Sequence, residues 1–159
     1  MRAALGSMAF AVGLFMLPVA ATAQTGGPAG VWLTQKGDAH VRIAPCGAAL
    51  CGTIVWLRDP IDGETGRPLT DKHNPVPARR SNPMIGTQIM FGMQPSGLNR
   101  WSGHFYNSQD GQTYDGNLVL LSPDSVKAEG CLIGICMGEN WQRVESARPA
   151  PAAKSHNKG

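Results

Sequence analysis

The sequence predicts an all-β protein built as one eight-stranded antiparallel up-and-down barrel. Three observations favour this fold. The 159-residue chain contains 20 glycines and 12 prolines, and beyond residue 24 no window keeps an apolar repeat of 3.6 residues. Short apolar or alternating runs are instead separated by turn residues. Most of the intervals are short, so neighbouring strands should be antiparallel. A two-sheet β-sandwich is the alternative that the same pattern allows.

Eight segments are expected to be strands: residues 30–34, 39–44, 51–57, 87–93, 100–106, 113–121, 125–131 and 136–144. In the second, Val41 and Ile43 alternate with polar residues and should face the core. The third is an almost continuous apolar run, a pattern that is compatible with burial on both faces. Asp110-Gly111 is a strong signal for a tight hairpin between the fifth and sixth. Closing the sheet would remove the exposed edges of an open one.

The first 23 residues have the three-part build of a cleavable signal peptide. Arg2 supplies the positive charge, an apolar stretch runs to Leu17, and Ala21-Thr22-Ala23 offers the small residues that cleavage needs. The apolar stretch is shorter than the roughly 20 residues of a spanning helix. We therefore expect a periplasmic or secreted protein with a single domain over residues 24–145, no membrane insertion after cleavage, and a disordered tail over 146–159.

Four cysteines occur in two identical spacings, Cys46 with Cys51 and Cys131 with Cys136. An oxidising compartment favours disulfides, and a gap of four residues suits two facing positions of a hairpin. We expect the bridges Cys46–Cys51 and Cys131–Cys136. A four-thiolate metal site and a thiol oxidoreductase are the alternatives. The intervening residues are apolar or glycine, and no two-residue gap is present, so neither metal nor any other cofactor is expected.

Tryptophans mark the first and the last expected strand. Gly30-Val31-Trp32 opens the first, and Trp141-Gln142-Arg143 lies on the last. This pattern resembles the lipocalin signature, in which the first tryptophan closes one end of a barrel and the arginine packs across its ring. A cation–π contact of this kind contributes about 0.5–2 kcal/mol. Trp32, Trp141 and Arg143 are therefore candidate structural residues, and two ordinary core tryptophans are the alternative.

A longer series of motifs resembles the bacterial family called domain of unknown function 2147. The motifs are Gly30-Val31-Trp32, Ile43-Ala44-Pro45-Cys46, Cys51-Gly52-Thr53-Ile54-Val55-Trp56-Leu57, Asp71 with Asn74-Pro75, Gly86, Trp101 with Gly103 and Tyr106, Asp110-Gly111 with Thr113-Tyr114, and Trp141 with Arg143. The resemblance implies an exported, lipocalin-like barrel without an established general activity. The family pattern includes the first cysteine pair, whereas the second rests on its spacing alone.

The long polar segment from residue 58 to 86 is rich in proline, glycine and aspartate, and segments of this kind are functional or disordered. If it folds over the barrel mouth, Asp71, Asn74, Arg79 and Arg80 are the candidate ligand contacts, because arginine suits carboxylate and phosphate groups. The alternative is that Asp71 pairs with one of these arginines and anchors the segment. The carboxylates near residue 60 lack the spacing of an EF-hand calcium loop.

Catalytic residues are not expected, since none of the four histidines falls in a metal-binding or nucleophile motif. The net charge of +3 is scattered, which disfavours nucleic acid as a partner. One hypothesis is a non-enzymatic binding protein that holds a small, mainly apolar molecule in or at the mouth of the barrel. Met84, Met90 and Met93 motivate it, because methionine adapts to irregular apolar partners. The other is a cell-envelope interaction module or inhibitor that acts through the Arg58–Gly86 segment.

Overall fold

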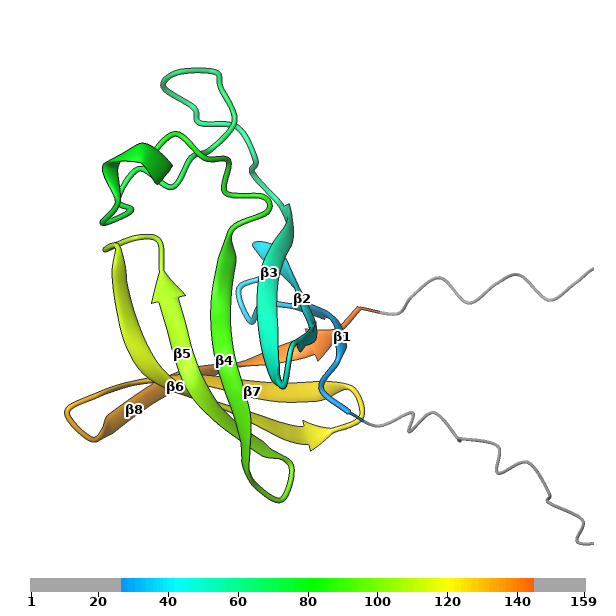
Figure 1. Ribbon diagram of the computed structural model, residues 1–159. Helices are drawn as coiled ribbons and strands as arrows, with labels where there is room; N and C mark the ends of the chain where they lie inside the picture. Colours follow the sequence, from blue (N-terminus) through cyan, green and yellow to red (C-terminus); the bar gives the residue numbers. More distant parts are fainter. Residues whose placement is uncertain (1–26, 145–159) are drawn as a thin grey trace, which may run out of the picture.

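The protein is a closed antiparallel barrel in which each strand pairs with the next and β1 pairs with β8 (Figure 1). The computed structural model describes residues 27–144. The strands are β1 (Gly30–Leu33), β2 (Ala39–Cys46), β3 (Ala49–Leu57), β4 (Gln88–Gly97), β5 (Arg100–Asn107), β6 (Gln112–Ser122), β7 (Ser125–Leu132) and β8 (Ile135–Arg143), with a short 3-10 helix η1 (Pro77–Arg79) between β3 and β4. The barrel prediction is confirmed, and the sandwich alternative is wrong.

The expected signal peptide and tail lie outside the described residues. Within residues 27–144, no helix has the length and apolar character needed to cross a bilayer. All eight expected strands are present, several of them one to three residues longer than expected. The largest extension is at the end of β4, which continues through Pro95 to Gly97, so the turn before β5 shrinks to Leu98 and Asn99.

The two ends of the barrel are built differently. One end, which we call the floor, carries the tight β2–β3, β4–β5 and β6–β7 turns. The other, which we call the open end, carries the β1–β2 connection, the long segment 58–87 and the β5–β6 and β7–β8 turns. In Figure 1 the long segment arches over the open end, and the β7–β8 hairpin points away to one side. Any hollow at the open end is therefore bounded by these connections.

The core fills the floor half of the barrel. Val41 and Ile43 are buried, as their alternation predicts. Fully or nearly fully buried apolar side chains include Trp32, Met90, Met93, Leu118, Val126 and Trp141. Burial of the third strand on both faces, which its apolar run allows, is not observed. Only one face of β3 meets the core, and Trp56 on the other face is 40% exposed, with its ring centroid 4.4 Å from that of His40.

Arg143 closes the floor by reaching across the ring of Trp32. Its guanidinium carbon lies 4.1 Å from the ring centroid. Its two terminal nitrogens donate to the carbonyls of Gly27 and Ala29, each at 2.9 Å. A side chain at Gly30 would strike Arg143, because an added Cβ would lie 2.4 Å from its Nη1 atom. The chain needs glycine there for close approach, and the first and last strands meet at this point, where Trp32 pairs with Arg143.

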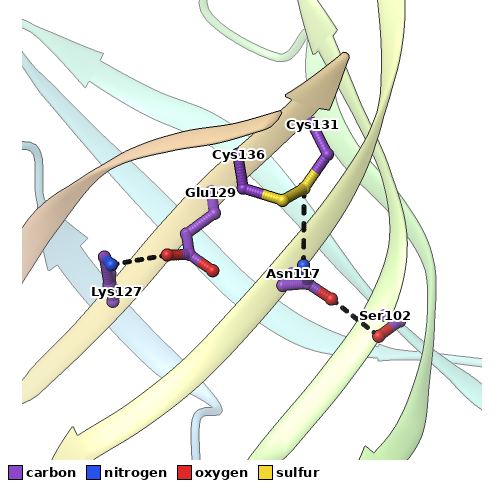
Figure 2. Close-up of a disulfide and its surroundings, with 6 residues drawn as sticks. All are labelled: Ser102, Asn117, Lys127, Glu129, Cys131 and Cys136. Atoms are coloured by element: carbon purple, nitrogen blue, oxygen red, sulfur yellow. Dashed lines mark hydrogen bonds and ion pairs between the residues drawn. A yellow bond between two sulfur atoms is a disulfide. The ribbon is translucent and has the colours of Figure 1, made fainter. Parts of the chain in front are cut away.

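Both expected disulfides are present, Cys46–Cys51 and Cys131–Cys136. The first is diagonal across the β2–β3 hairpin, because Cys46 lies opposite Ala49. The second joins directly opposite residues, with a Cα–Cα distance of 4.0 Å. Figure 2 shows it on the polar outer face of the barrel, where Asn117 Nδ2 donates to Cys131 Sγ at 3.5 Å. The bridge leaves the inner face of the β7–β8 hairpin to apolar side chains.

The turn beyond this bridge places a β-branched residue in a strained conformation. Ile133 has φ +50° and Gly134 has φ +77°, the signs of a type I′ turn, for which Asn-Gly is preferred. Ile133 is 94% exposed, so its side chain makes little packing contact in return. We expect Ile133→Asn to stabilise the protein by about 1 kcal/mol, a rise in melting temperature of about 3–6 °C. Thermal unfolding followed by circular dichroism measures it, and an unchanged or lower midpoint would contradict it.

Candidate functional site

A trough opens on the inner wall of the barrel at its open end. Its deeper part, about 460 Å³, is lined by Phe105, Ala128 and Trp141 among others. An adjoining part of about 500 Å³ lies against Tyr114, Leu132 and Ile135. Both parts are also lined by Asn107, Gly130 and Met137, so they adjoin each other at these residues. We call the two parts together the mouth trough.

The pairing of the strands explains why these side chains face inward. Directly opposite residues of antiparallel strands share a face, and Phe105 lies opposite Tyr114. Phe105 packs against the buried core, so Tyr114 faces the same side. Gly116, Gly130 and Met137 follow on the same face across β6, β7 and β8. The trough wall is therefore the continuation of the core surface beyond the point where core side chains fill the barrel.

Two glycines shape the trough in opposite ways. An added Cβ at Gly116 would lie 2.2 Å from Phe105 Cδ2, so this glycine is needed to seat the Phe105 ring. At Gly130 the nearest atom to an added Cβ is Tyr114 Cβ at 3.8 Å, which is an ordinary contact. Gly130 thus leaves open space that a side chain would fill. The Phe105 and Trp141 rings meet edge to face, 6.3 Å apart, and end the trough toward the floor.

Several polar groups along the trough are hydrogen bonded to one another. Trp141 Nε1 donates to Glu139 Oε1 at 2.6 Å. Tyr114 Oη donates to Asp110 Oδ2 at 2.7 Å, and this bond raises the pKa of Tyr114. The backbone N–H of Gln112 is the main cause of the lowered pKa of the Asp110 carboxyl. These bonds engage Trp141, Glu139, Tyr114 and Asp110, and Lys36 and Glu129 also line the deeper part. The rest of the trough offers a ligand mostly apolar surface.

A second hollow, the outer cleft, lies between the long segment and the outer face of the barrel. Its volume is about 700 Å³, and the barrel contributes Phe91, Tyr106 and Thr113 to its wall. Tyr106 lies opposite Thr113 and next in sequence to the inward-facing Phe105, which puts both on the outside. The cleft therefore does not open into the barrel interior.

Asp71 fastens the long segment to the barrel in this cleft. It is 2% exposed, and Tyr106 Oη donates to its Oδ1 atom at 2.7 Å. Asn74 Nδ2 donates to the other carboxylate oxygen of Asp71, Oδ2, at 2.7 Å. The backbone N–H of Asp71 donates to Asn82 O at 3.0 Å. A buried carboxylate with both oxygens hydrogen bonded is a stable anchor. The long segment is thus ordered over the open end.

The structure brings together three of the four residues predicted to contact a ligand. Asp71, Asn74 and Arg79 line the outer cleft. Arg80 lies instead at a separate hollow of about 510 Å³, and its Nε donates to Asn74 O at 2.8 Å. The expected pairing of Asp71 with Arg79 or Arg80 is wrong, since Tyr106 and Asn74 occupy the carboxylate. The Tyr106 hydroxyl hydrogen bonds to the Asp71 carboxylate, and this avoids the free-energy cost of burying a charged guanidinium beside it.

Tyr106 and the residues of the mouth trough are site residues that the sequence alone does not predict. Tyr106 lies at the open end of an expected strand, directly after Phe105. Successive side chains of a strand point to opposite faces, and this alternation is the signal that places Tyr106 on the outer face. For the trough, the signal is glycine at two inward positions, Gly116 and Gly130, beside an apolar hairpin. Neither signal indicates a site until the register is known.

The anchor predicts how the two tyrosines of the chain titrate. Burial, and then the hydrogen bond to Asp71, raises the pKa of Tyr106 to about 12. A raised tyrosine pKa means that folding favours the protonated hydroxyl. The anchor's contribution to stability is complete below the unfolded pKa of about 10 and is lost as pH rises toward 12. Absorbance at 295 nm should show a late ionisation that Tyr106→Phe removes. Titration of both tyrosines at the ordinary pKa would contradict this.

A scan against protein-family models matches residues 30–143 to the family described as "Uncharacterized protein conserved in bacteria (DUF2147)". The chain belongs to this family. The match covers nearly all of the described barrel of this DUF2147 protein. A search of the curated proteins finds no match.

Among solved structures, this DUF2147 barrel is similar to one titled "Protein HP1028 from the human pathogen Helicobacter pylori belongs to the lipocalin family". The two chains share 18% sequence identity with a TM-score of 0.64. The match covers 76% of this chain and 85% of the Helicobacter pylori chain. The likeness shows that the DUF2147 domain has a lipocalin-like fold, which is the fold its sequence motifs imply.

Proposed function

We propose that this protein is a non-enzymatic binding protein that holds a small, mainly apolar ligand in the mouth trough. A lipocalin-like barrel is consistent with such a role, although one fold hosts many functions. The observation that carries the proposal is the trough itself. An apolar wall continues from the core to the open end, and Gly130 leaves the space between Tyr114 and Met137 unfilled.

The size and chemistry of the trough suit such a ligand. Its two parts, about 460 and about 500 Å³, lie within the ~300–1,000 Å³ range of small-molecule sites. Leu132, Ile135 and Met137 are 61%, 71% and 79% exposed along its rim. Apolar side chains this exposed would lose contact with water when a ligand covers them, which favours binding. Met137 is also flexible enough to fit more than one ligand shape.

The outer cleft fits an apolar ligand less well. Asp71, Asn74, Arg79, Asn82, Thr87 and Gln88 all line it. An apolar molecule placed there would remove the more exposed of these groups, those of Arg79, Asn82 and Gln88, from water without replacing their hydrogen bonds, at a cost of about 1–3 kcal/mol for each group fully buried. The candidate ligand contacts Asp71, Asn74 and Arg79 would therefore bind a polar group of a ligand rather than an apolar one.

Two measurements test the proposal. Native mass spectrometry of protein purified from its own host should show an adduct of a few hundred daltons, lost on organic extraction. The extracted protein should then bind the apolar dye N-phenyl-1-naphthylamine saturably, with one site per chain. The dye's fluorescence should rise on binding because the trough shields it from water. No adduct together with no saturable dye binding would overturn the proposal.

A protein-interaction role for the Arg58–Gly86 segment is the second candidate, and the ordered outer cleft favours it. Val76 and Ile85 line the cleft and are each 45% exposed, and Arg79 lies beside them. Apolar contacts flanking an arginine suit an envelope protein segment that carries a carboxylate. If the segment acts in this way, Arg79→Glu should abolish binding of a partner cross-linked to the wild-type protein and leave dye binding unchanged. Partner capture that survives Arg79→Glu would rule this out.

A further inference from the structure

One side of β8 has no strand partner along most of its length. β8 runs over Ile135–Arg143, but β1 ends at Leu33. The β1–β8 pairing consists of Trp32 opposite Arg143 and Leu33 opposite Gln142. Within residues 27–144, no strand continues this pairing toward the β7–β8 turn. The barrel is therefore closed at its floor and has a strand edge at its open end, which Figure 1 shows where β8 extends past β1.

The hydrogen bonds near the floor identify the backbone groups that face this edge. Val144 N–H donates to Val31 O at 2.8 Å, toward β1. Arg143 N–H donates to Asp124 O at 2.9 Å, toward the β6–β7 turn. Backbone groups of a strand alternate in direction, so even-numbered residues of β8 face the edge. Asn140 agrees with this alternation, because its backbone N–H faces the same side as β1 and donates to Gln35 Oε1 at 2.9 Å.

The short Cα–Cα distance of the second disulfide agrees with this phase. At 4.0 Å, Cys131 and Cys136 have the spacing of a pair that exchanges no hydrogen bonds. The N–H and C=O groups of Cys136 thus point away from β7. The N–H and C=O groups of Gly138, two residues further along β8, point the same way. Cys136 and Gly138 present two donors and two acceptors to the edge, and no other residue in the described part of the chain is paired with them there.

From Ile135 to Gly138 the strand itself lacks the features that usually prevent strand pairing, while Lys36 and Glu139 line the hollow beside Gly138. This stretch carries no charge, no proline and no register shift. Ile135 and Met137 are 71% and 79% exposed beside it. Gly138 cannot bear a side chain, because an added Cβ would lie 2.4 Å from Ala128 O. An unguarded edge with exposed apolar neighbours is a template for another strand.

We propose that two copies of this chain pair antiparallel along the β8 edge, about a twofold axis at Gly138. The spacing of the unpaired groups is self-complementary. Antiparallel pairing centred on Gly138 sets it opposite its counterpart and sets Cys136 opposite Asn140 of the other copy. Each of these pairs exchanges two N–H···O=C bonds once Gln35 releases Asn140. Glu139, the one charged residue of the paired stretch Cys136–Asn140, lies opposite Met137 of the other copy, so no like charges meet face to face. Ile135 and Met137 of both copies gain cover.

Sedimentation equilibrium over a wide concentration range tests this with the chain as it exists. A short edge of this kind should give a dimer with a dissociation constant on the order of 10–100 µM. Met137→Lys and Ile135→Lys should raise that constant by about tenfold or more, because lysine beside an edge opposes pairing. Both side chains are largely exposed, so neither change disturbs the core. Leu98→Lys, at an even more exposed apolar position in a turn on the floor, is the control and should leave the dimer intact.

Amide hydrogen exchange then tests the register. Exchange at Cys136 and Gly138 should be fast in dilute solution and slow by about tenfold or more as the dimer forms. Ile135 and Met137, whose N–H groups face β7, should be protected at both concentrations. Gly130→Ile fills the mouth trough and should leave the dimer unchanged, so failure of ligand binding and failure of pairing are distinguishable. A chain that stays monomeric, a dimer that survives both lysine variants, or a dimer without protection at Gly138 would each overturn the proposal.

Discussion

Replacing Arg143 with alanine should lower the free energy of unfolding by about 2–4 kcal/mol. The change removes the cation–π contact with Trp32, which contributes about 0.5–2 kcal/mol, and leaves a 0%-exposed ring without its cover. It also removes donors to the carbonyls of Gly27, Ala29 and Pro123. Charge-assisted bonds of this type have a net value of about 1.5–3 kcal/mol when shielded, and partial exposure lowers it.

Urea unfolding of the purified variant measures this effect. Arg143→Lys keeps the charge but loses the planar fork that spans Gly27 and Ala29, so its loss should be intermediate. Arg100→Ala is the matched control, because Arg100 is an exposed arginine at the floor end of β5 and should change stability by no more than about 0.5 kcal/mol. A loss below about 1 kcal/mol for Arg143→Ala would show that the floor does not depend on this contact.

Replacing Gly130 with isoleucine should abolish ligand binding without unfolding the barrel. Gly130 lies in both parts of the mouth trough, so one added side chain obstructs the whole hollow. The nearest atom to its Cβ is 3.8 Å away, so the residue fits. Glycine weakens a strand interior by about 0.5–1 kcal/mol, and a β-branched residue should restore that stability. We expect dye affinity to fall by at least about tenfold, since the trough loses most of its apolar contact area.

The control for this variant is an isoleucine added where it meets nothing. Gly63, on the long segment, has no atom within 4 Å of an added Cβ. Gly63→Ile should bind the dye as the wild type does. Dye titration and thermal unfolding on the three proteins separate occlusion from misfolding. Full affinity in a folded Gly130→Ile protein would place the ligand outside the trough.

The fold could be predicted because each of its signals is local. Alternation at Val41 and Ile43, the Asp110-Gly111 turn and the spaced cysteines each fix a hairpin without knowledge of the rest. The exposed face of β3 could not be predicted, because an apolar run does not show which side of a sheet is covered. Trp56 meets the ring of His40 on that outer face, and this contact depends on the pairing of β2 with β3.

The sites were predicted less completely, because they depend on register and on the path of a long segment. The choice of Asp71 as a key residue of that segment follows from its polar surroundings in sequence. Its partner Tyr106 lies 35 positions away on the outer face of β5, and only the folded chain brings them together. The mouth trough depends on the space beside Gly130, where no side chain fills the inner face. Such unfilled space follows from the packing of neighbouring strands, which the sequence alone does not give.

A methyl NMR titration tests most directly whether the ligand lies in the mouth trough, as we propose, rather than in the outer cleft. Protein labelled at isoleucine, leucine, valine and methionine methyl groups is titrated with N-phenyl-1-naphthylamine. We expect chemical-shift changes at Leu132, Ile135 and Met137, with Val76 and Ile85 unchanged. Shifts confined to Val76 and Ile85 would contradict this expectation and move the site to the outer cleft.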